Sequence, residues 1–344
     1  MPFASPAPAS SGSPSKIGVL LVNLGTPDAA DPPAVKRYLR EFLSDPRVVE
    51  LPALLWQPIL RGVVLTTRPK KSAHAYGQVW TPEGSPLAVN TAATARALAE
   101  RFAGEGVLID WAMRYGNPSI ADRVKAMLAA GCDRLLFAPL YPHYCGATTA
   151  TANDALFSVL AGLRVQPAVR TLPSYHAEPA YIGAVADGIR AGLAALDHAP
   201  DALLLSYHGM PERTRQLGDP YHDQCVETSR LLVEALRGDF AGPIETSFQS
   251  RFGKAKWLEP STEDKLAELA SKGVRSVAVA APGFSADCVE TLEEIAIRGE
   301  EFFSKNGGSR LHYFPCLNAD PKAINLYEGL VRRELSGWQA PPPF

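Results

Sequence analysis

Short, uninterrupted apolar runs recur along the chain, and they limit the possible folds more than any other feature. The clearest are IGVLLVNL at 17–24, RLLFAPLY at 134–141 and ALLLSY at 202–207. Runs of this length are typical of strands that are buried on both faces, as in a parallel sheet covered by helices. Segments with helical periodicity lie between them, for example at 120–130 and 179–196. This alternation predicts βαβ units and a doubly wound parallel sheet.

The order of strands, loops and helices is similar in the two halves of the chain, which predicts an α/β protein of two Rossmann-like lobes. We expect an N-terminal lobe over residues 17–172, a C-terminal lobe over 173–318 and a closing helix over 319–335. Residues 1–16 are rich in Pro, Ala and Ser, and we expect them and residues 336–344 to be disordered tails. The chain has no GxGxxG or GxxxxGK[ST] motif, so a nucleotide site has no support.

Charge and cysteine content argue against several classes of protein. The chain has 34 Lys and Arg against 36 Asp and Glu, so we expect no nucleic-acid partner. Its five cysteines are odd in number and form no CxxC pair, which predicts no disulfide framework and indicates a reducing cytoplasm. No segment approaches the roughly 20 apolar residues of a membrane-spanning helix. We therefore expect a cytoplasmic protein.

One strongly apolar segment, residues 42–60, has three prolines and is expected to make a poor strand or long helix. Buried packing is the plain interpretation. The alternative is an exposed surface for a flat apolar ligand or for a membrane, so a peripheral contact at the inner face of the membrane stays open.

A histidine and a group of acids follow predicted buried strands, at the sheet edge where α/β proteins bind ligands. His208 directly follows the run at 202–207, which suits a general base, although a histidine bonded only to loop backbone fits equally well.

Glu290 and Glu294 share one face of a predicted helix, and Asp287 lies one turn earlier, where helix capping also explains it. Imidazole and carboxylates together suit proton removal and transient contact with a divalent cation such as Fe²⁺. No HExxH or Cys₂His₂ pattern indicates a permanent metal site.

A short basic run, TRPKK at 67–71, carries Arg68, Lys70 and Lys71. These cations suit the carboxylate arms of a ligand. A solvated surface is the plainer interpretation.

Several longer blocks of the chain resemble the ferrochelatases. In order they are LLVNLGTPD (20–28), YLREFLSDPRVVELP (38–52), GSPL (84–87), MRYGNPSI (113–120), LYPHY (140–144), SYHGMPERTRQLGDPYHDQC (206–225), SFQSRFGKAKWLEP (247–260) and PGFSADCVETLEEI (282–295). The resemblance runs from about residue 17 to about residue 330, and ordered blocks of this length are far more specific than one short motif. The pattern is similar to that of the bacterial, protoporphyrin-using members.

The resemblance implies a chelatase-like fold with a porphyrin cleft between the two lobes. It implies that the chain inserts Fe²⁺ into protoporphyrin IX to form protohaem, the terminal step of haem biosynthesis, with the ring held distorted. Protoporphyrin IX and Fe²⁺ are then the partners, both as substrates. Three alternatives stay open: a chelatase for coproporphyrin or for another tetrapyrrole and metal such as cobalt, a non-catalytic porphyrin or haem carrier, and a nucleotide-binding module.

The resemblance also implies roles for particular residues. His208 and Glu290 would act on the pyrrole protons and the incoming metal from opposite faces of the ring, with Asp287 as a further catalytic acid and Glu294 as a metal contact. Which of His208 and Glu290 takes the protons stays open. Expected substrate contacts are the family positions Arg114, Tyr115, Tyr221 and Ser250, with Leu24 as apolar wall and Arg68, Lys70 and Lys71 as cations.

The chain departs from some ferrochelatases at three places. Cys288 stands where some relatives have a histidine two residues before the catalytic glutamate, which argues against a metal ligand there. Arg298 stands where some relatives continue the acids by one more turn. Some relatives carry a [2Fe–2S] cluster, which needs four cysteines, but no cysteine follows Cys316. We therefore expect no cluster and no other prosthetic group.

Overall fold

The computed structural model describes residues 16–251, 253 and 255–338, so most of both expected tails lies outside the described residues. The described chain divides into two compact units. Unit 1 takes its residues from 1–140, 146–173 and 324–344, and unit 2 takes 141–145 and 174–323. The last helix, α12 (Pro321–Glu334), spans a boundary, because its residues from 324 onward belong to unit 1.

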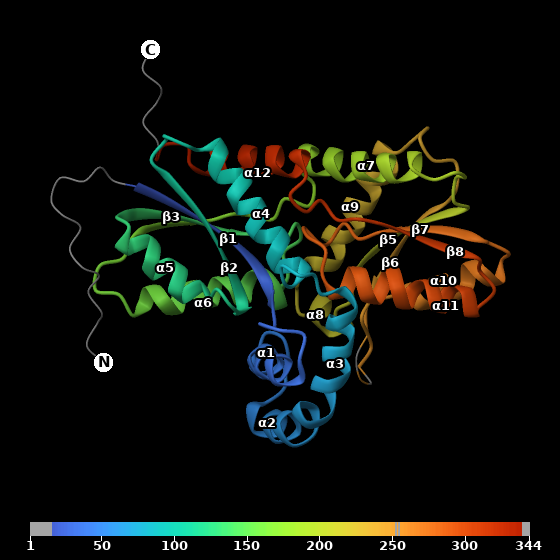
Figure 1. The fold of residues 1–344 in the computed structure, drawn as a ribbon, viewed down its shortest axis with the longest axis horizontal. Helices are drawn as coiled ribbons and strands as arrows, with labels where there is room; N and C mark the ends of the chain where they lie inside the picture. The colour runs from blue at the N-terminus through green and yellow to red at the C-terminus, as the bar shows by residue number, and fades with distance from the viewer. Residues whose placement is uncertain (1–15, 252, 254, 339–344) are drawn as a thin grey trace, which may run out of the picture. The chain divides into compact units, whose positions relative to one another are not determined.

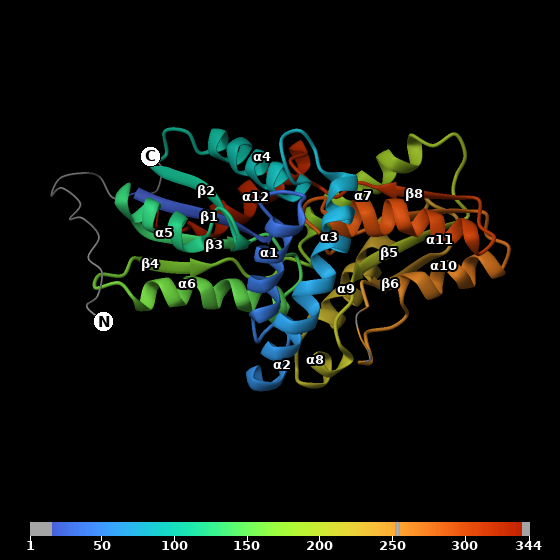
Figure 2. The same ribbon diagram turned by 60° about the horizontal axis from the view of Figure 1, so that its bottom comes forward.

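Unit 1 is built on a four-stranded parallel sheet in the order β2-β1-β3-β4 (Figures 1 and 2). The central strand β1 is the first apolar run of the sequence, and its residues from Ile17 to Asn23 are all buried. Helix α1 begins where Asp31 accepts a hydrogen bond from the Ala34 N–H at 2.8 Å. The elements of the unit are β1 (Lys16–Thr26), α1 (Pro32–Ser44), α2 (Ala53–Ile59), η1 (Leu60–Val64), α3 (Leu65–Val79), α4 (Pro86–Arg101), β2 (Val107–Gly116), α5 (Ile120–Ala129), β3 (Cys132–Pro139), η2 (Gly146–Ala150), α6 (Thr151–Ala161) and β4 (Ala168–Thr171).

Unit 2 repeats this arrangement with a parallel sheet in the order β6-β5-β7-β8. Its central strand β5 is the apolar run at 202–207 extended by His208, and the first six residues of the strand are buried. The elements are α7 (Pro179–Ala194), β5 (Ala202–His208), α8 (Glu212–Gln216), α9 (Tyr221–Ala235), β6 (Ile244–Gln249), α10 (Thr262–Ser271), β7 (Ser276–Ala280), η3 (Glu290–Gly299), α11 (Glu300–Lys305) and β8 (Arg310–Phe314). Because both sheets follow the same strand order, the prediction of two Rossmann-like halves is confirmed.

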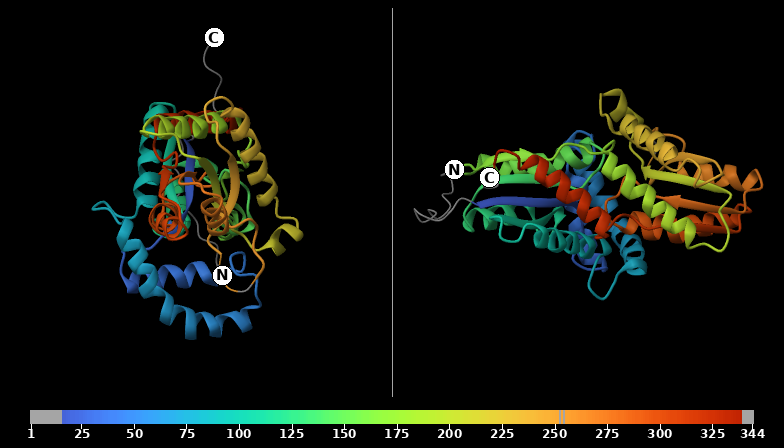
Figure 3. Two further views of the ribbon diagram at one scale, coloured as in Figure 1. Left: turned by 90° about the vertical axis from the view of Figure 1, so that its right-hand side faces the viewer. Right: turned by 90° about the horizontal axis from the view of Figure 1, so that it is seen from above.

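The expectation that the apolar segment at 42–60 avoids a long helix is wrong from Ala53 onward. Helix α2, the π-helix η1 and helix α3 follow one another without a break and carry the chain from Ala53 to Val79. The wider π winding begins two residues after Pro58, so the chain stays helical past a residue that lacks an N–H donor. In Figure 3 this helical run (blue to cyan) projects away from the sheet of its own unit.

The predicted helix that carries Glu290 and Glu294 exists, but its first part is not α-helical. Residues Glu290–Gly299 form the π-helix η3, and α11 continues from Glu300 to Lys305. In a π-helix backbone bonds join residues five apart, so side chains five apart come closer than in an α-helix. Glu293 and Arg298, five apart, make an ion pair with 2.9 Å between Arg298 Nε and Glu293 Oε1.

Candidate active site

His208 is the last residue of β5, and Gly209 follows it in the segment between β5 and α8. The imidazole Nδ1 lies 2.7 Å from the carbonyl oxygen of Gly209. A carbonyl oxygen only accepts hydrogen bonds, so this contact assigns the proton of the neutral imidazole to Nδ1 and leaves the lone pair on Nε2. The ring is half-buried and lies 6.4 Å, centroid to centroid, from that of Phe284. His208 thus has a base-competent nitrogen at the carboxyl edge of its sheet.

Tyr221 holds the backbone of His208 through a hydrogen bond. Its side chain is buried, and its hydroxyl donates to the backbone carbonyl of His208 at 3.0 Å. Burial raises the pKa of this phenol well above its ordinary value, so it stays a neutral donor. The hydroxyl that we expected to contact substrate is therefore used to hold the backbone of His208.

The acids Glu290 and Glu294 lie on η3 in the same unit. Glu294 Oε2 accepts a 2.6 Å hydrogen bond from Ser250 Oγ and lies 3.5 Å from Arg298 Nη2. Burial raises the pKa of the Glu294 carboxyl, the nearby Glu290 charge adds to this rise, and Ser250, His208 and Arg298 oppose it. Ser250, His208, Glu290 and Glu294 thus form one interacting group, which joins four of the predicted site residues.

Asp287 precedes η3 and faces a different set of partners. Its two carboxylate oxygens accept from Tyr313 Oη at 2.6 Å, Asn318 Nδ2 at 2.7 Å, Thr291 Oγ1 at 3.0 Å and the Cys316 N–H at 3.3 Å. The Asp287 N–H in turn donates to Asn318 Oδ1 at 2.8 Å. Because the carboxylate is buried and already accepts four donors, it fixes the start of η3 and has little capacity for a further hydrogen-bond donor or a metal.

In unit 1, the predicted pair Arg114 and Tyr115 surrounds a carboxylate that sequence reasoning missed. Asp45 Oδ2 accepts from Arg114 Nη2 at 2.6 Å, from Tyr115 Oη at 2.9 Å and from Thr151 Oγ1 at 2.5 Å. Burial acts to raise the pKa of Asp45, but the hydrogen bonds from Thr151, the Arg47 N–H and Tyr115 and the Arg114 charge outweigh it, so the net pKa is lowered. Tyr115 is fully buried, which suits positioning of Arg114 better than contact with a ligand.

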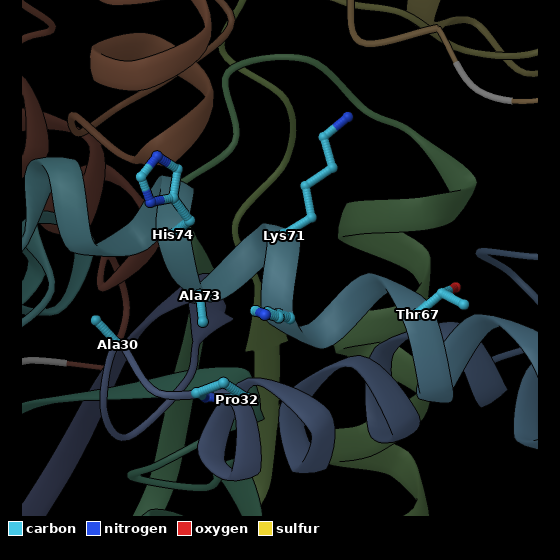
Figure 4. A pocket seen from close by; sticks show the side chains of 7 residues that line it. Ala30, Pro32, Thr67, Lys71, Ala73 and His74 are labelled. Atoms are coloured by element: carbon cyan, nitrogen blue, oxygen red, sulfur yellow. The ribbon is translucent and has the colours of Figure 1, made fainter.

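Two of the three predicted cations line a surface hollow of about 640 Å³ in unit 1. Lys70, Lys71 and His74 contribute the basic groups of its lining, and the remaining lining residues are Ala30, Pro32, Thr67 and Ala73. In Figure 4 Ala73 faces Pro32, while Lys71 and His74 extend from α3 away from Pro32. Arg68, half-buried on the same helix, is outside this lining, as is Leu24, which is half-buried near the end of β1.

An exposed apolar surface covers α2 and the residues beside it. Leu54 is 91% exposed and Leu55 is 66% exposed. We call this surface the apolar lip, and its members are Leu51, Leu54, Leu55, Ile59 and Val63. Trp56 ties it to α1 through a hydrogen bond from its Nε1 to the Leu43 carbonyl at 2.6 Å. The interpretation of residues 42–60 as buried packing is therefore wrong for Leu51, Leu54, Leu55 and Ile59, and the lip extends beyond that segment to Val63.

Within residues 16–251, 253 and 255–338, no three His, Cys, Asp or Glu side chains converge in a way that would hold a metal ion. All five cysteines carry free thiols. In the same described ranges, no helix is both long and apolar enough to cross a bilayer.

Comparison with known proteins gives a consistent result along almost the whole chain. The family model described as Ferrochelatase matches residues 16–335. A ferrochelatase of Mesorhizobium japonicum is 51% identical over 97% of this chain and 95% of its own length. A ferrochelatase of Rhizobium meliloti is 50% identical over 94% of this chain and 96% of its own, and one of an Azoarcus species is 49% identical over 99% and 94%.

Solved structures support the fold. SirB from Bacillus subtilis with Fe³⁺ aligns with a TM-score of 0.55 at 11% identity, covering 94% of this chain and 99% of that one. The sirohydrochlorin chelatase SirB from a second Bacillus subtilis subspecies, in complex with cobalt, aligns with a TM-score of 0.51 at 12% identity over 92% and 94%. At such identities the likeness shows a chelatase-type fold alone. The match of the family model and the relatives near 50% identity show more: this chain belongs to the ferrochelatase family.

Proposed function

We propose that this chain inserts Fe²⁺ into protoporphyrin IX and releases protohaem and two protons. Family membership over nearly the full length is the observation that carries this proposal. The reaction breaks two pyrrole N–H bonds and forms bonds from the pyrrole nitrogens to iron, so it needs proton acceptors beside the ring. The interacting group of His208, Glu290 and Glu294 in unit 2 offers one imidazole and two carboxylates for that purpose.

His208 accepts a pyrrole proton, or meets the metal first, through Nε2. Its Nδ1 is already used on the Gly209 carbonyl, which fixes the ring and its tautomer. Glu290 takes the corresponding role on the opposite face of the porphyrin, with Glu294 behind it. Burial raises the pKa of Glu294, which makes that carboxyl a better proton acceptor than a surface glutamate.

The propionates of the porphyrin need cationic partners. Lys70 and Lys71 are exposed on α3 beside the hollow in unit 1, and Arg68 lies on the same helix. Arg114 is fixed by Asp45, and Leu24 offers an apolar side chain at the end of a central strand. These residues and Ser250 are our proposed substrate contacts, while Tyr115 and Tyr221 act by holding Arg114 and the His208 loop.

We further propose a cytoplasmic enzyme that touches the membrane through the apolar lip. The sequence from residue 47 to residue 71 carries five basic residues and one acid, a charge that suits anionic headgroups. Sedimentation with anionic vesicles tests this, because Leu54→Ser with Leu55→Ser should lower binding, whereas Val226→Ser, an exposed apolar residue on α9, should not. Equal binding by all three proteins would contradict the proposal.

We propose that no [2Fe–2S] cluster takes part. A cluster needs four cysteine ligands, and the sequence has no cysteine beyond Cys316. Iron and sulfide analysis of protein purified without oxygen tests this, and stoichiometric sulfide would refute it.

The central test is an anaerobic assay that follows loss of porphyrin fluorescence with protoporphyrin IX and Fe²⁺. Wild type should convert the porphyrin, while His208→Ala and Glu290→Ala should each reduce kcat by about 100-fold or more. His198→Ala, which removes an exposed histidine from a loop, is the matched control and should retain activity. Wild type that acts only on coproporphyrin, or only with cobalt, would favour another chelatase. Porphyrin binding without conversion would favour a carrier.

A further inference from the structure

Gln249 lies between the loop that carries His208 and the helix that carries Glu290. It is the last residue of β6, the strand that lies beside β5 in Figure 2. In the register of the sheet it pairs with His208. Its side chain is buried, with only 3% of the residue exposed. A buried amide needs partners for both its oxygen and its nitrogen, so its contacts define what it holds.

Both ends of this amide are hydrogen-bonded. Nε2 donates to the backbone carbonyl of Glu290 at 2.8 Å, and Oε1 accepts from Ser206 Oγ at 2.8 Å. A carbonyl oxygen can only accept, so the nitrogen of the amide must face Glu290 and the amide has one orientation. The side chain therefore ties the first residue of η3 to the strand that ends in His208.

The backbone of Gln249 fixes the other side of the site. Its carbonyl accepts from the Gly209 N–H at 2.7 Å. A Cβ on Gly209 would lie 2.4 Å from this carbonyl oxygen, so the backbone after His208 packs directly against Gln249. One residue thus contacts both the loop of His208 and the start of the Glu290 helix.

The contacts of the next residue strengthen this link. Ser250 has a left-handed φ of 65°, and its hydroxyl donates to Glu294 Oε2 at 2.6 Å. The hydrogen bonds continue from Ser206, the partner of the Gln249 amide. Ser206 Oγ lies 2.8 Å from Thr262 Oγ1, which lies 3.0 Å from Ser247 Oγ. Thr262 therefore contacts Ser206, which orients the Gln249 amide, while the Ser247 hydroxyl contacts Thr262 and is one hydrogen bond further from Gln249.

We propose that Gln249 is a positioning residue for iron insertion, which sets Glu290 relative to His208 without touching the substrate. This inference rests on the proposed function. Removal of two protons from one rigid ring requires acceptors at fixed places, and a misplacement of about 1 Å costs on the order of 100-fold in rate. Loss of the Gln249 amide should therefore lower kcat and leave porphyrin binding almost unchanged.

The test uses three variants of the full chain. Gln249→Met keeps the length of the side chain and removes both hydrogen bonds. Ser206→Ala keeps the bond to Glu290 and removes the one that orients the amide oxygen. Ser247→Ala is the matched control, because it removes a buried hydroxyl of the same network that is hydrogen-bonded to Thr262 and not to the Gln249 amide. Each is assayed for kcat, for the KM of protoporphyrin and Fe²⁺, and for thermal stability.

We expect kcat of Gln249→Met to fall by about 10- to 100-fold, with the KM of protoporphyrin within about threefold of wild type. Ser206→Ala should lose about two- to fivefold in kcat. If Gln249→Met does not fold, the comparison of Ser206→Ala with Ser247→Ala tests the inference. Ser247→Ala should lose stability but keep kcat within about twofold.

Unchanged kcat in Gln249→Met would overturn the inference, as would an equal loss in Ser247→Ala or an effect confined to KM. Wild type that forms no haem in the same assay would instead overturn the proposed function, and the inference with it.

Discussion

His143 permits a quantitative prediction about stability against pH. The side chain is fully buried in unit 2, and its ring centroid lies 5.4 Å from that of Tyr207 and 6.0 Å from that of Tyr221. The hydroxyl of Thr228 donates to a backbone carbonyl, so it accepts from His143 Nε2–H at 2.8 Å. Nδ1 is buried without a hydrogen-bond partner, which is compatible only with the neutral ring. Burial lowers the pKa of His143 to about 3.

The sign and size of the effect follow from this pKa. An unfolded chain binds a proton at His143 below about pH 6.5, while the folded chain does not until about pH 3. Between these values the unfolded state binds more protons, so stability falls with decreasing pH by about 1.4 kcal/mol per pH unit. At pH 5 this one group should therefore lower the free energy of unfolding by about 2 kcal/mol relative to neutral pH.

His143→Gln isolates this contribution, because glutamine does not titrate and its amide nitrogen can still donate to Thr228. Urea denaturation of both proteins at pH 5, 6 and 7.5 gives the free energy of unfolding. The difference between variant and wild type should shift by about 2 kcal/mol in favour of the variant from pH 7.5 to pH 5. His198→Gln, which replaces an exposed loop histidine, should run parallel to wild type. Parallel curves for His143→Gln and wild type would refute the reasoning.

Two further predictions concern residues that hold the site. In Asp287→Asn an NH₂ donor replaces one of the two oxygens that together accept four hydrogen bonds, so the free energy of unfolding in urea should drop by about 2–4 kcal/mol. A loss below about 0.5 kcal/mol would contradict the buried geometry. Gly209→Ala should displace the His208 loop and reduce kcat for haem formation at least about tenfold, because its Cβ meets the Gln249 carbonyl. Gly183→Ala on α7 has open space around its Cβ and is the control for a stable, active protein.

The central strands of the two sheets could be predicted from sequence, because burial on both faces leaves a continuous apolar run. β1, β3 and β5 all arise from such runs. The edge strands β4 and β6 could not be predicted this way, because an edge strand has a partner on one side only and tolerates polar residues. β6 reads Ile-Glu-Thr-Ser-Phe-Gln, and two of its polar side chains, Ser247 and Gln249, are buried and hydrogen-bonded inside the unit. Gln249 went unnoticed for that reason.

The acids of η3 show a second limit of sequence periodicity. The grouping of Glu290 with Glu294 assumed α-helical spacing, and the two are indeed electrostatic neighbours. The π winding also brings Glu293 to Arg298, a pair that α-helical spacing does not predict. Hydrophobic periodicity does not distinguish 3.6 residues per turn from a wider winding over so short a stretch. Asp45 and Asn318 were missed for another reason, since each acts through partners more than 25 residues away.

The number of hydrogen bonds that each polar side chain already makes separates residues that hold the site from residues that can still bind a proton or a ligand. Asp287 accepts four donors, and Gln249 uses both ends of its amide. His208 uses one ring nitrogen and retains the other, and burial favours protonation of Glu294. An acceptor whose lone pairs all accept fixed donors has little capacity for a new partner. An acceptor with an unused lone pair can still accept a proton. In the mechanism that we propose, His208 and the η3 glutamates accept the protons, while Asp287 and Gln249 fix where those acceptors lie.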